Sequence, residues 1–176
     1  MKQILIVVDM QKDFVDGALG TPEAVGIVDK VVKKIEEFDG DILVTYDTHF
    51  ENYLQTQEGE KLPIAHCIKD SDGWALDARV QAALRKRGYR SFEKPTFGCV
   101  ALPQYIYAHY NPLELEIELI GLCTDICVVS NALLLKASFP ETRMRVDASC
   151  CAGVTVETHK AALTTMKMCQ IQVIGE

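Results

Sequence analysis

The sequence predicts a three-layer α/β/α domain with a mostly parallel, six-stranded sheet. Segments with the pattern of a strand and segments with the pattern of a helix alternate about six times, which is typical of this class. The first strand-like segments are continuous apolar runs, as expected for strands covered on both faces. A length of 176 residues with 48% hydrophobic content suits one domain that spans residues 1–176.

The first part of the chain predicts two buried strands with a helix between them. The apolar run at residues 4–8 is rich in β-branched residues and ends at Asp9. Residues 41–46 have a similar pattern and end at Asp47. Residues 21–40 predict a helix, because they begin with an N-cap, an N1 proline and an acidic residue and end at a glycine: Thr21, Pro22, Glu23 and Gly40.

Beyond a long loop at residues 48–73, a second helix and a third strand are expected. Residues 74–87 have apolar side chains at helical spacing and basic residues in the last turn. The glycine that follows, Gly88, suits the end of a helix. Residues 89–93 then predict a short strand that ends at Lys94.

The last part of the chain predicts three more strands. Residues 114–121 end in a continuous apolar run and lead into a helix that begins near Cys127. Residues 144–146 predict a weaker fifth strand. A helix at residues 155–166 and a strand at residues 171–174 complete the predicted fold.

Four ionisable side chains lie at the ends of predicted strands. Asp9, Asp47 and Lys94 end three of the strands, and Cys127 lies just past the fourth. Ligands of open parallel sheets bind beyond the carboxyl ends of the strands. We therefore expect the four groups to converge at one functional edge.

Cys127 is the best nucleophile candidate because it lies at the start of an apolar helix. The partial positive charge of a helix amino end, together with a nearby cation, lowers a cysteine pKa. Lys94 supplies a cation, and Asp9 supplies a carboxylate that can move the proton. Each residue also has an ordinary interpretation: a cysteine that fills space, an exposed loop charge and a carboxylate that caps a strand end.

Histidines and carboxylates in the long loop indicate a metal site. Asp47 and His49 lie at i and i+2 of an extended segment, so their side chains point to the same side. His66 follows in the same loop, with Glu58 between. Two imidazoles with carboxylates suit zinc, iron or manganese, although polar residues that fasten a long loop would give the same pattern. The other histidines have no such neighbours and are expected on the surface or a helix face: His109 and His159.

The composition argues against several functional classes. The net charge of −7 includes no basic run of the kind that binds nucleic acid. No apolar stretch reaches the ~18 residues of a membrane span, and no signal-type cleavage pattern is present, so we expect a cytoplasmic protein without nucleic-acid or membrane partners. The seven cysteines are expected to be mostly reduced and buried rather than to form a disulfide framework.

Three segments together resemble the isochorismatase-like cysteine hydrolase family. Residues 7–14 (V-V-D-M-Q-K-D-F) resemble its opening V-D-x-Q-x-D-F signature, and Phe92-Glu93-Lys94 resembles its lysine strand end. Residues 121–127 (G-L-C-T-D-I-C) resemble its G-x-A-T-D-x-C nucleophile turn. The resemblance runs in order over nearly the whole chain and implies the α/β fold of that family.

By this likeness Asp9, Lys94 and Cys127 form a catalytic triad. The backbone amides of Cys123 and Cys127 form the oxyanion hole, beside a cis peptide expected at Leu122–Cys123. Members of the isochorismatase branch lack the nucleophilic cysteine and the metal, so Cys127 indicates a different branch. Cys123 departs from the small alanine of the family and brings a second thiol near the first.

Within the family, the metal set is similar to that of nicotinamidases, which convert nicotinamide to nicotinate and ammonia in NAD salvage. Asp47, His49 and His66 match the ligands of one divalent ion, zinc first, with iron or manganese as alternatives. In those enzymes the ion holds the pyridine nitrogen, and Glu58 matches an acidic fourth ligand of some members. The resemblance also implies a homo-oligomer. Three aromatic residues match positions that enclose the substrate ring: Phe14, Trp74 and Phe97.

Three other functions remain open from the sequence. An amidase for another small amide or carbamoyl compound would share the triad and lack the metal. A thiol-redox protein would use Cys123 and Cys127, although their spacing is unlike a C-x-x-C motif. A non-catalytic scaffold would keep the fold and the metal but turn over no amide.

Overall fold

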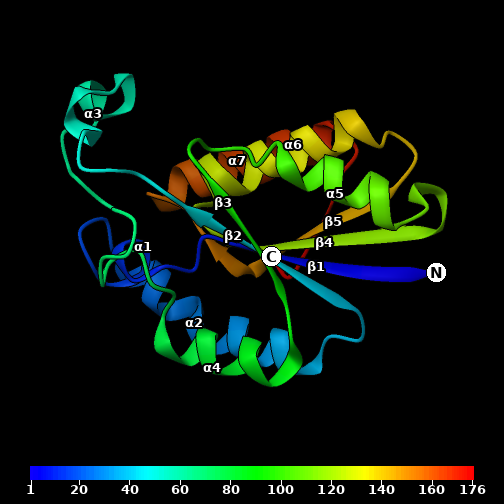
Figure 1. Ribbon diagram of the computed structural model, residues 1–176. Coiled ribbons are helices and arrows are strands. Elements are labelled where there is room, and N and C mark those ends of the chain that lie inside the picture. Colours follow the sequence, from blue (N-terminus) through cyan, green and yellow to red (C-terminus); the bar gives the residue numbers. More distant parts are fainter.

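Six strands form one sheet in the computed structural model, which describes residues 1–176 (Figure 1). Every pair of neighbouring strands is parallel, so the sheet is fully parallel where the sequence predicted a mostly parallel one. The strand order is β3-β2-β1-β4-β5-β6. The strands are β1 (Lys2–Val8), β2 (Asp41–Asp47), β3 (Arg90–Lys94), β4 (Leu115–Leu122), β5 (Arg143–Ala152) and β6 (Gln172–Ile174).

Helices cover both faces of the sheet, which confirms the three-layer α/β/α prediction (Figure 1). One face packs against α1 (Lys12–Val15), α2 (Pro22–Glu37) and α4 (Ala78–Arg87). The other face packs against α5 (Ala101–His109), α6 (Val129–Ser138) and α7 (Val156–Met168).

The central strand β1 shows why its apolar run is continuous. Leu5 and Val7 belong to the core on one face of the sheet, whereas Ile4, Ile6 and Val8 belong to the core on the other. Successive side chains of a strand point to opposite faces, so a strand covered on both sides needs apolar residues at every position.

The order of the strands determines where a ligand can bind. The chain proceeds from β1 outward to β2 and β3, then returns to the opposite side of β1 to form β4, β5 and β6. The direction of winding therefore reverses between β1 and β4. In open parallel sheets this reversal leaves a crevice at the carboxyl ends of the strands.

Short helical turns lie in the connections between the main elements. They are η1 (Tyr53–Gln55), α3 (Gln57–Lys61), η2 (Pro112–Glu114) and the π-helical turn η3 (Thr124–Val128). The segment that carries α3 extends away from the sheet in Figure 1. The turn η3 joins β4 directly to α6.

The short helices α1, η1, α3 and η2 were not predicted, and three longer elements also differ from the sequence prediction. Helix α5 was not predicted, and Pro103 in its first turn obscures the helical pattern. Helix α4 begins at residue 78 rather than 74, because the side chain of Asp77 caps its first amides. Strand β5 extends well beyond residues 144–146, since Asp147 and Ser149 interrupt its apolar pattern without ending the strand.

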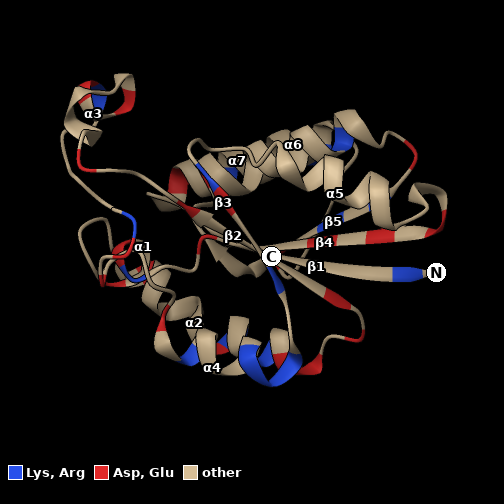
Figure 2. Ribbon diagram, viewed as in Figure 1, with Lys and Arg blue, Asp and Glu red and all other residues tan.

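Charged residues are spread over most elements (Figure 2). The last turn of α4 contains three basic residues, Arg85, Lys86 and Arg87, at the end where the helix dipole favours cations. No helix combines the length and the apolar composition that a membrane span requires.

Candidate functional site

The carboxyl edge of the sheet brings the predicted strand-end residues together. Asp47 and Lys94 are the last residues of β2 and β3 and are paired in the register of those strands. Asp9 directly follows β1, and Cys127 lies in η3, just past β4. All four side chains are at least 96% buried, as the exposed fractions of 0% for Asp9, 3% for Asp47, 1% for Lys94 and 4% for Cys127 show.

Lys94 is the centre of this group. Its Nζ lies 2.7 Å from Oδ2 of Asp9 and 3.3 Å from Oδ1 of Asp47. It also donates to Sγ of Cys127 at 3.4 Å. Burial by itself lowers the pKa of Lys94, but the attraction of Asp9, Cys127 and Asp47 outweighs it and raises that pKa. The ammonium group therefore stays charged in the interior.

Asp9 is held in place by its backbone and by Thr45. Its φ of 46° is unusual for a residue other than glycine, and such strained conformations cluster at functional sites. The hydroxyl of Thr45 donates to Oδ1 at 2.6 Å. The Oδ2 atom makes an ion pair with Lys94 but has no partner aligned for a hydrogen bond. Burial raises the pKa of Asp9 even though Lys94 opposes it, so this carboxyl can hold a proton.

The protonation state of Cys127 differs from the sequence prediction. Burial and then the carboxylate of Asp9 raise the pKa of the Cys127 thiol well above its ordinary value, and the effect of Lys94 is smaller. The expectation of a pKa lowered by the helix end and a cation is therefore wrong. A base must remove the proton from the thiol, and Asp9 supplies a carboxylate in the same buried group.

The turn before Cys127 has the backbone geometry expected of a nucleophile turn. Gly121 has φ 119°, and a Cβ there would lie 2.1 Å from the carbonyl oxygen of Val8, so only glycine fits. The Leu122–Cys123 peptide is cis, as predicted. The amides of residues 126 and 128 donate to the carbonyl of Cys123, whereas those of Cys123 and Cys127 donate to no backbone carbonyl outside the regular elements.

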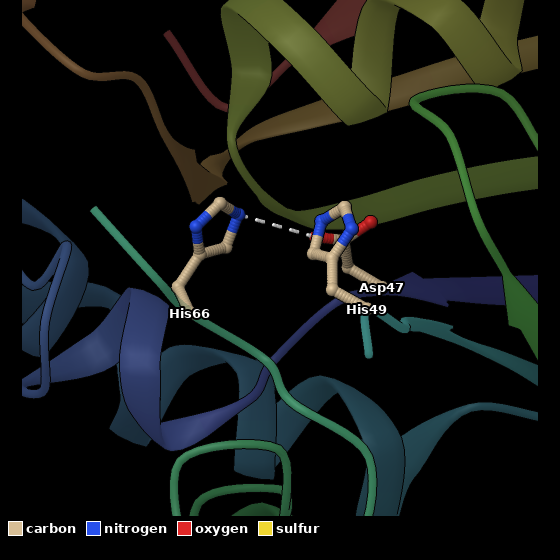
Figure 3. Close-up of side chains that lie close together, drawn as sticks. All are labelled: Asp47, His49 and His66. Carbon is tan, nitrogen blue, oxygen red and sulfur yellow. Dashed lines mark hydrogen bonds and ion pairs between the residues drawn. The ribbon is translucent and has the colours of Figure 1, made fainter. Parts of the chain in front are cut away.

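Asp47, His49 and His66 form a compact group that can hold a metal ion (Figure 3). One ligand atom from each lies within 4.8 Å of the others. Nε2 of His49 lies 2.9 Å from Oδ2 of Asp47, and Nε2 of His66 lies 3.5 Å from the same oxygen. Oε1 of Glu58 lies 3.6 Å and 3.7 Å from these two nitrogens, so it stands where a fourth ligand would.

The chemistry of this donor set fits a divalent transition metal. Burial by itself raises the pKa of Asp47, but hydrogen bonds with His49 and His66 and the charge of Lys94 hold it well below its ordinary value. Nδ1 of His66 bonds to the carbonyl of Ile64 at 2.8 Å, which leaves Nε2 for a metal. Ionised carboxylate with two imidazoles suits zinc, iron or manganese.

Two side chains that the sequence analysis did not single out hold the candidate metal ligands in place. Gln11 is fully buried, accepts from the amide of Asp47 at 2.8 Å and donates to its carbonyl at 2.8 Å. Asp13 accepts from the amide of Cys67 at 2.7 Å and thereby fixes the chain next to His66. Both residues belong to the segment 7–14, so that motif was the signal for them.

A cavity of about 620 Å³ opens beside the buried groups. Cys127 and Cys123 line it together with the candidate metal ligands, and Phe14 and Phe97 contribute aromatic walls. Trp74, which was expected to enclose the ring, does not line this cavity. Its ring packs against Tyr46 at 5.1 Å, and its Nε1 donates to Thr48 at 2.9 Å, because the loop turns the indole toward β2.

The remaining histidines occupy different environments. His109 is exposed at the end of α5 and bonds to the carbonyl of Tyr105 in its own helix. His159 lies on α7 with a half-buried ring, and its Nδ1 lies 2.8 Å from the hydroxyl oxygen of Thr124. His159 therefore supports the nucleophile turn, a contact that the sequence did not indicate.

The comparisons with known proteins agree with this geometry. The model of the isochorismatase domain family matches residues 3–175. A nicotinamidase/pyrazinamidase from Bacillus subtilis is similar in structure, with 25% sequence identity, a TM-score of 0.85, and coverage of 99% of this chain and 100% of that one. No curated protein matches the chain.

Two further solved structures share the fold. A pyrazinamidase of Pyrococcus horikoshii in complex with zinc has 24% identity and a TM-score of 0.80, with full coverage of both chains. A protein from L. infantum in complex with nicotinate has 18% identity and a TM-score of 0.83, with coverage of 98% of this chain and 92% of that one.

Proposed function

The chain belongs to the isochorismatase family, and we propose that it is a metal-dependent amidase that hydrolyses nicotinamide to nicotinate and ammonia through a thioester on Cys127. The observation that carries this proposal is the meeting of two groups at one cavity. The Asp9–Lys94–Cys127 group supplies the chemistry of acyl transfer, and the Asp47–His49–His66 set supplies an anchor for the substrate. The similarity to the nicotinamidase from Bacillus subtilis, at 25% identity, supports the same assignment.

Substrate binding uses the cavity walls and the metal-binding residues. Asp47, His49 and His66, with Glu58 as the fourth ligand, would hold one divalent ion, zinc first, which supplies an electrophilic anchor for the pyridine nitrogen. Phe14 and Phe97 flank the ring. Aromatic contacts of this kind contribute roughly 0.5–1.5 kcal/mol beyond burial, so they adjust the fit rather than determine it.

The first chemical step forms the thioester. Asp9 takes the proton from the thiol of Cys127, and Sγ attacks the carboxamide carbon. The raised pKa of Asp9 suits a carboxylate that must hold this proton. The amides of Cys123 and Cys127 donate to the developing oxyanion, and one such donor is worth about 2.7–4 kcal/mol.

The second half of the reaction returns the enzyme to its starting state. Asp9 delivers the proton to the leaving nitrogen, which departs as ammonia. Water then attacks the thioester carbon while Asp9 accepts one of its protons, and the C–S bond breaks. Nicotinate leaves, its remaining proton passes to solvent, and the proton on Asp9 returns to Sγ of Cys127. Lys94 remains charged throughout and balances the negative charge that moves between Asp9 and Cys127.

A different small amide is the second candidate for the substrate. Trp74 does not line the cavity, and Cys123 contributes a thiol to its wall. The cavity of about 620 Å³ therefore has fewer ring-enclosing contacts than the family likeness implied. A redox function is less favoured, since burial raises the pKa of Cys123 to about 12 and keeps its thiol protonated.

Ammonia release from a panel of small amides, with metal content measured on the same sample, tests the proposal. We expect turnover of nicotinamide, close to one divalent ion per chain, and loss of turnover with a chelator. If the protein hydrolyses other amides but not nicotinamide, the substrate is one of those amides and not nicotinamide. Full nicotinamide turnover by metal-free protein would remove the role of the Asp47–His49–His66 set.

A further inference from the structure

Asn131 connects the nucleophile turn to one wall of the cavity. It lies in α6, one helical turn after Cys127, and is fully buried. Its Nδ2 donates to the carbonyl of Cys127 at 2.8 Å and to the carbonyl of Phe97 at 3.2 Å. Its Oδ1 accepts from the amide of Cys99 at 2.8 Å. One side-chain amide therefore joins three backbone groups from two segments that are far apart in the sequence.

The segment that Asn131 holds has little other support. Residues 95–98 lie between β3 and α5, outside every helix and strand, and take part in none of the backbone hydrogen bonds of turns and loops. A Cβ added to Gly98 would contact the side chain of Leu134 at 3.5 Å, so this backbone rests against α6. The bond from Asn131 to the carbonyl of Phe97 thus connects this segment to the core, and the bond from the amide of Cys99 fixes the residue that follows it.

The same segment forms part of the cavity wall. Pro95, Thr96 and Phe97 line the cavity together with residues of the long loop. The side chain of Phe97 is 42% exposed, so packing alone does not immobilise it. The distance between this wall and Sγ of Cys127 depends on what joins the two backbones, and Asn131 joins them directly.

We propose that Asn131 is a positioning residue that fixes the Phe97 wall of the cavity relative to Cys127 and so determines how tightly a small planar amide fits. The inference rests on the proposed amidase function for its kinetic consequences. Contacts with a cavity wall stabilise bound substrate and transition state alike, so losing them raises KM more than it lowers kcat.

Kinetics of Asn131→Ala and Phe97→Ala test the proposal. We expect each change to raise KM for nicotinamide roughly tenfold while kcat falls less than about threefold. If Asn131 acts through Phe97, adding Asn131→Ala to Phe97→Ala should raise KM by no more than about twofold further. Asn131→Thr keeps one hydroxyl that can bond to the backbone groups that Asn131 contacts, so it should raise KM less than Asn131→Ala does. It replaces Asn131→Ala in the test if the alanine variant does not fold.

Leu135→Ala is the matched control, because Leu135 is fully buried one turn further along α6. It should lower stability and leave KM unchanged within about twofold. A rise in KM equal to that of Asn131→Ala, or full additivity of Asn131→Ala with Phe97→Ala, would overturn the positioning role.

Hydrogen exchange tests the connection without any substrate. The amide of Cys99 donates to Asn131, so its exchange should accelerate in Asn131→Ala and Asn131→Thr but not in Leu135→Ala. If the wild-type protein hydrolyses no amide, the proposed function fails, while faster exchange at Cys99 would still support the connection. If the wild type is active and both KM and exchange stay unchanged in the Asn131 variants, the inference fails and the function stands.

Discussion

Two lysines in this protein each bridge a pair of buried carboxylates, but only one of them lies beside the proposed nucleophile. Nζ of Lys94 lies 2.7 Å and 3.3 Å from its two carboxylates, and Nζ of Lys34 lies 2.7 Å and 2.8 Å from its own pair. The partners are Asp9 and Asp47 for Lys94, and Glu118 and Asp147 for Lys34.

The Lys34 group is electrically balanced and fully bonded. Arg145 adds a second cation to Glu118 at 2.6 Å, so two cations face two carboxylates. The hydroxyl and the amide of Ser149 both donate to Oδ1 of Asp147. The side chain of Lys34 is 26% exposed, so part of its charge remains hydrated. These features describe an ion group that fastens α2 to the sheet.

The Lys94 group has the opposite properties. Lys94 alone faces the carboxylates of Asp9 and Asp47 beside the thiol of Cys127, so negative charge is in excess, and transfer of the thiol proton to Asp9 leaves that excess unchanged. Oδ2 of Asp9 lacks an aligned hydrogen bond, and a cavity opens beside Cys127. A buried ion pair by itself is therefore no mark of catalysis. The unsatisfied oxygen, the thiol and the cavity distinguish this group.

Removal of the Cys127 thiol should reduce amidase activity more than any other change. We expect Cys127→Ala to lower the rate of ammonia release by about 10⁴-fold or more, because no other group can form the thioester. Metal content should stay at the wild-type level. Cys151→Ala, which removes another buried thiol from the same core, is the control and should retain activity. Wild-type rates in Cys127→Ala would disprove the mechanism.

Replacement of the two lysines tests the comparison directly. Lys94→Met should reduce kcat by about 10³-fold, because the charge that balances Asp9 and the thiolate is lost. Lys34→Met should change kcat by less than about twofold but lower the free energy of unfolding by about 3 kcal/mol, because two buried carboxylates lose their shared cation. Steady-state kinetics and denaturant titration measure both effects. Equal losses of activity in the two variants would contradict the distinction.

Loss of one candidate metal ligand should reduce activity less than loss of Lys94. We expect His66→Ala to weaken metal binding by about 100-fold and to lower kcat/KM for nicotinamide by a similar factor, since one ligand is lost while the Cys127 group remains. Metal content by elemental analysis and ammonia release measure the two quantities. His109→Ala, at an exposed histidine, should change neither. Unchanged metal content in His66→Ala would exclude this residue as a ligand.

The smallest effect concerns stability in acid. Burial by itself raises the pKa of Asp147, but hydrogen bonds from Lys34 and Ser149 outweigh it and hold the pKa below its ordinary value. A carboxyl with a lowered folded-state pKa stabilises the protein above its unfolded pKa of about 3.9, and this contribution disappears as the pH falls through the folded pKa.

Asp147→Asn should therefore lower the free energy of unfolding by about 1–3 kcal/mol at neutral pH and flatten its decline below about pH 4. Denaturant titrations between neutral and acidic pH measure the decline, with activity unchanged at neutral pH. An acid-stability profile identical to that of the wild type would show that the Lys34 group contributes nothing to pH dependence.

Much of the fold and the main site residues could be predicted from the sequence. Asp9, Asp47 and Lys94 each follow a strand-like segment, and parallel strands bring their carboxyl ends to one edge of a sheet. The cis peptide and the Asp47–His49–His66 set were expected from the family resemblance and are present in the structure. The homo-oligomer and the cytoplasmic location remain predictions.

Other features could not be predicted because they depend on contacts between distant segments. Trp74 packs against Tyr46 rather than lining the cavity, and the path of a long loop decides this. Asn131 is an ordinary polar residue in the sequence, and its role follows only from its contacts with the segment before α5. The same holds for Gln11, whose amide fixes the backbone of Asp47.

The sequence by itself therefore determined the class of fold, the edge of the sheet that carries the candidate site and the strand-end residues that meet there. These properties follow from local patterns, since apolar periodicity and the first polar residue after a strand are written in consecutive positions. Only the tertiary structure decided that burial raises the pKa of the Cys127 thiol, that Lys94 is shared between two carboxylates and that Asn131 joins the backbone of Cys127 to the cavity wall. Those properties depend on desolvation and on distances across the fold, which no local pattern contains.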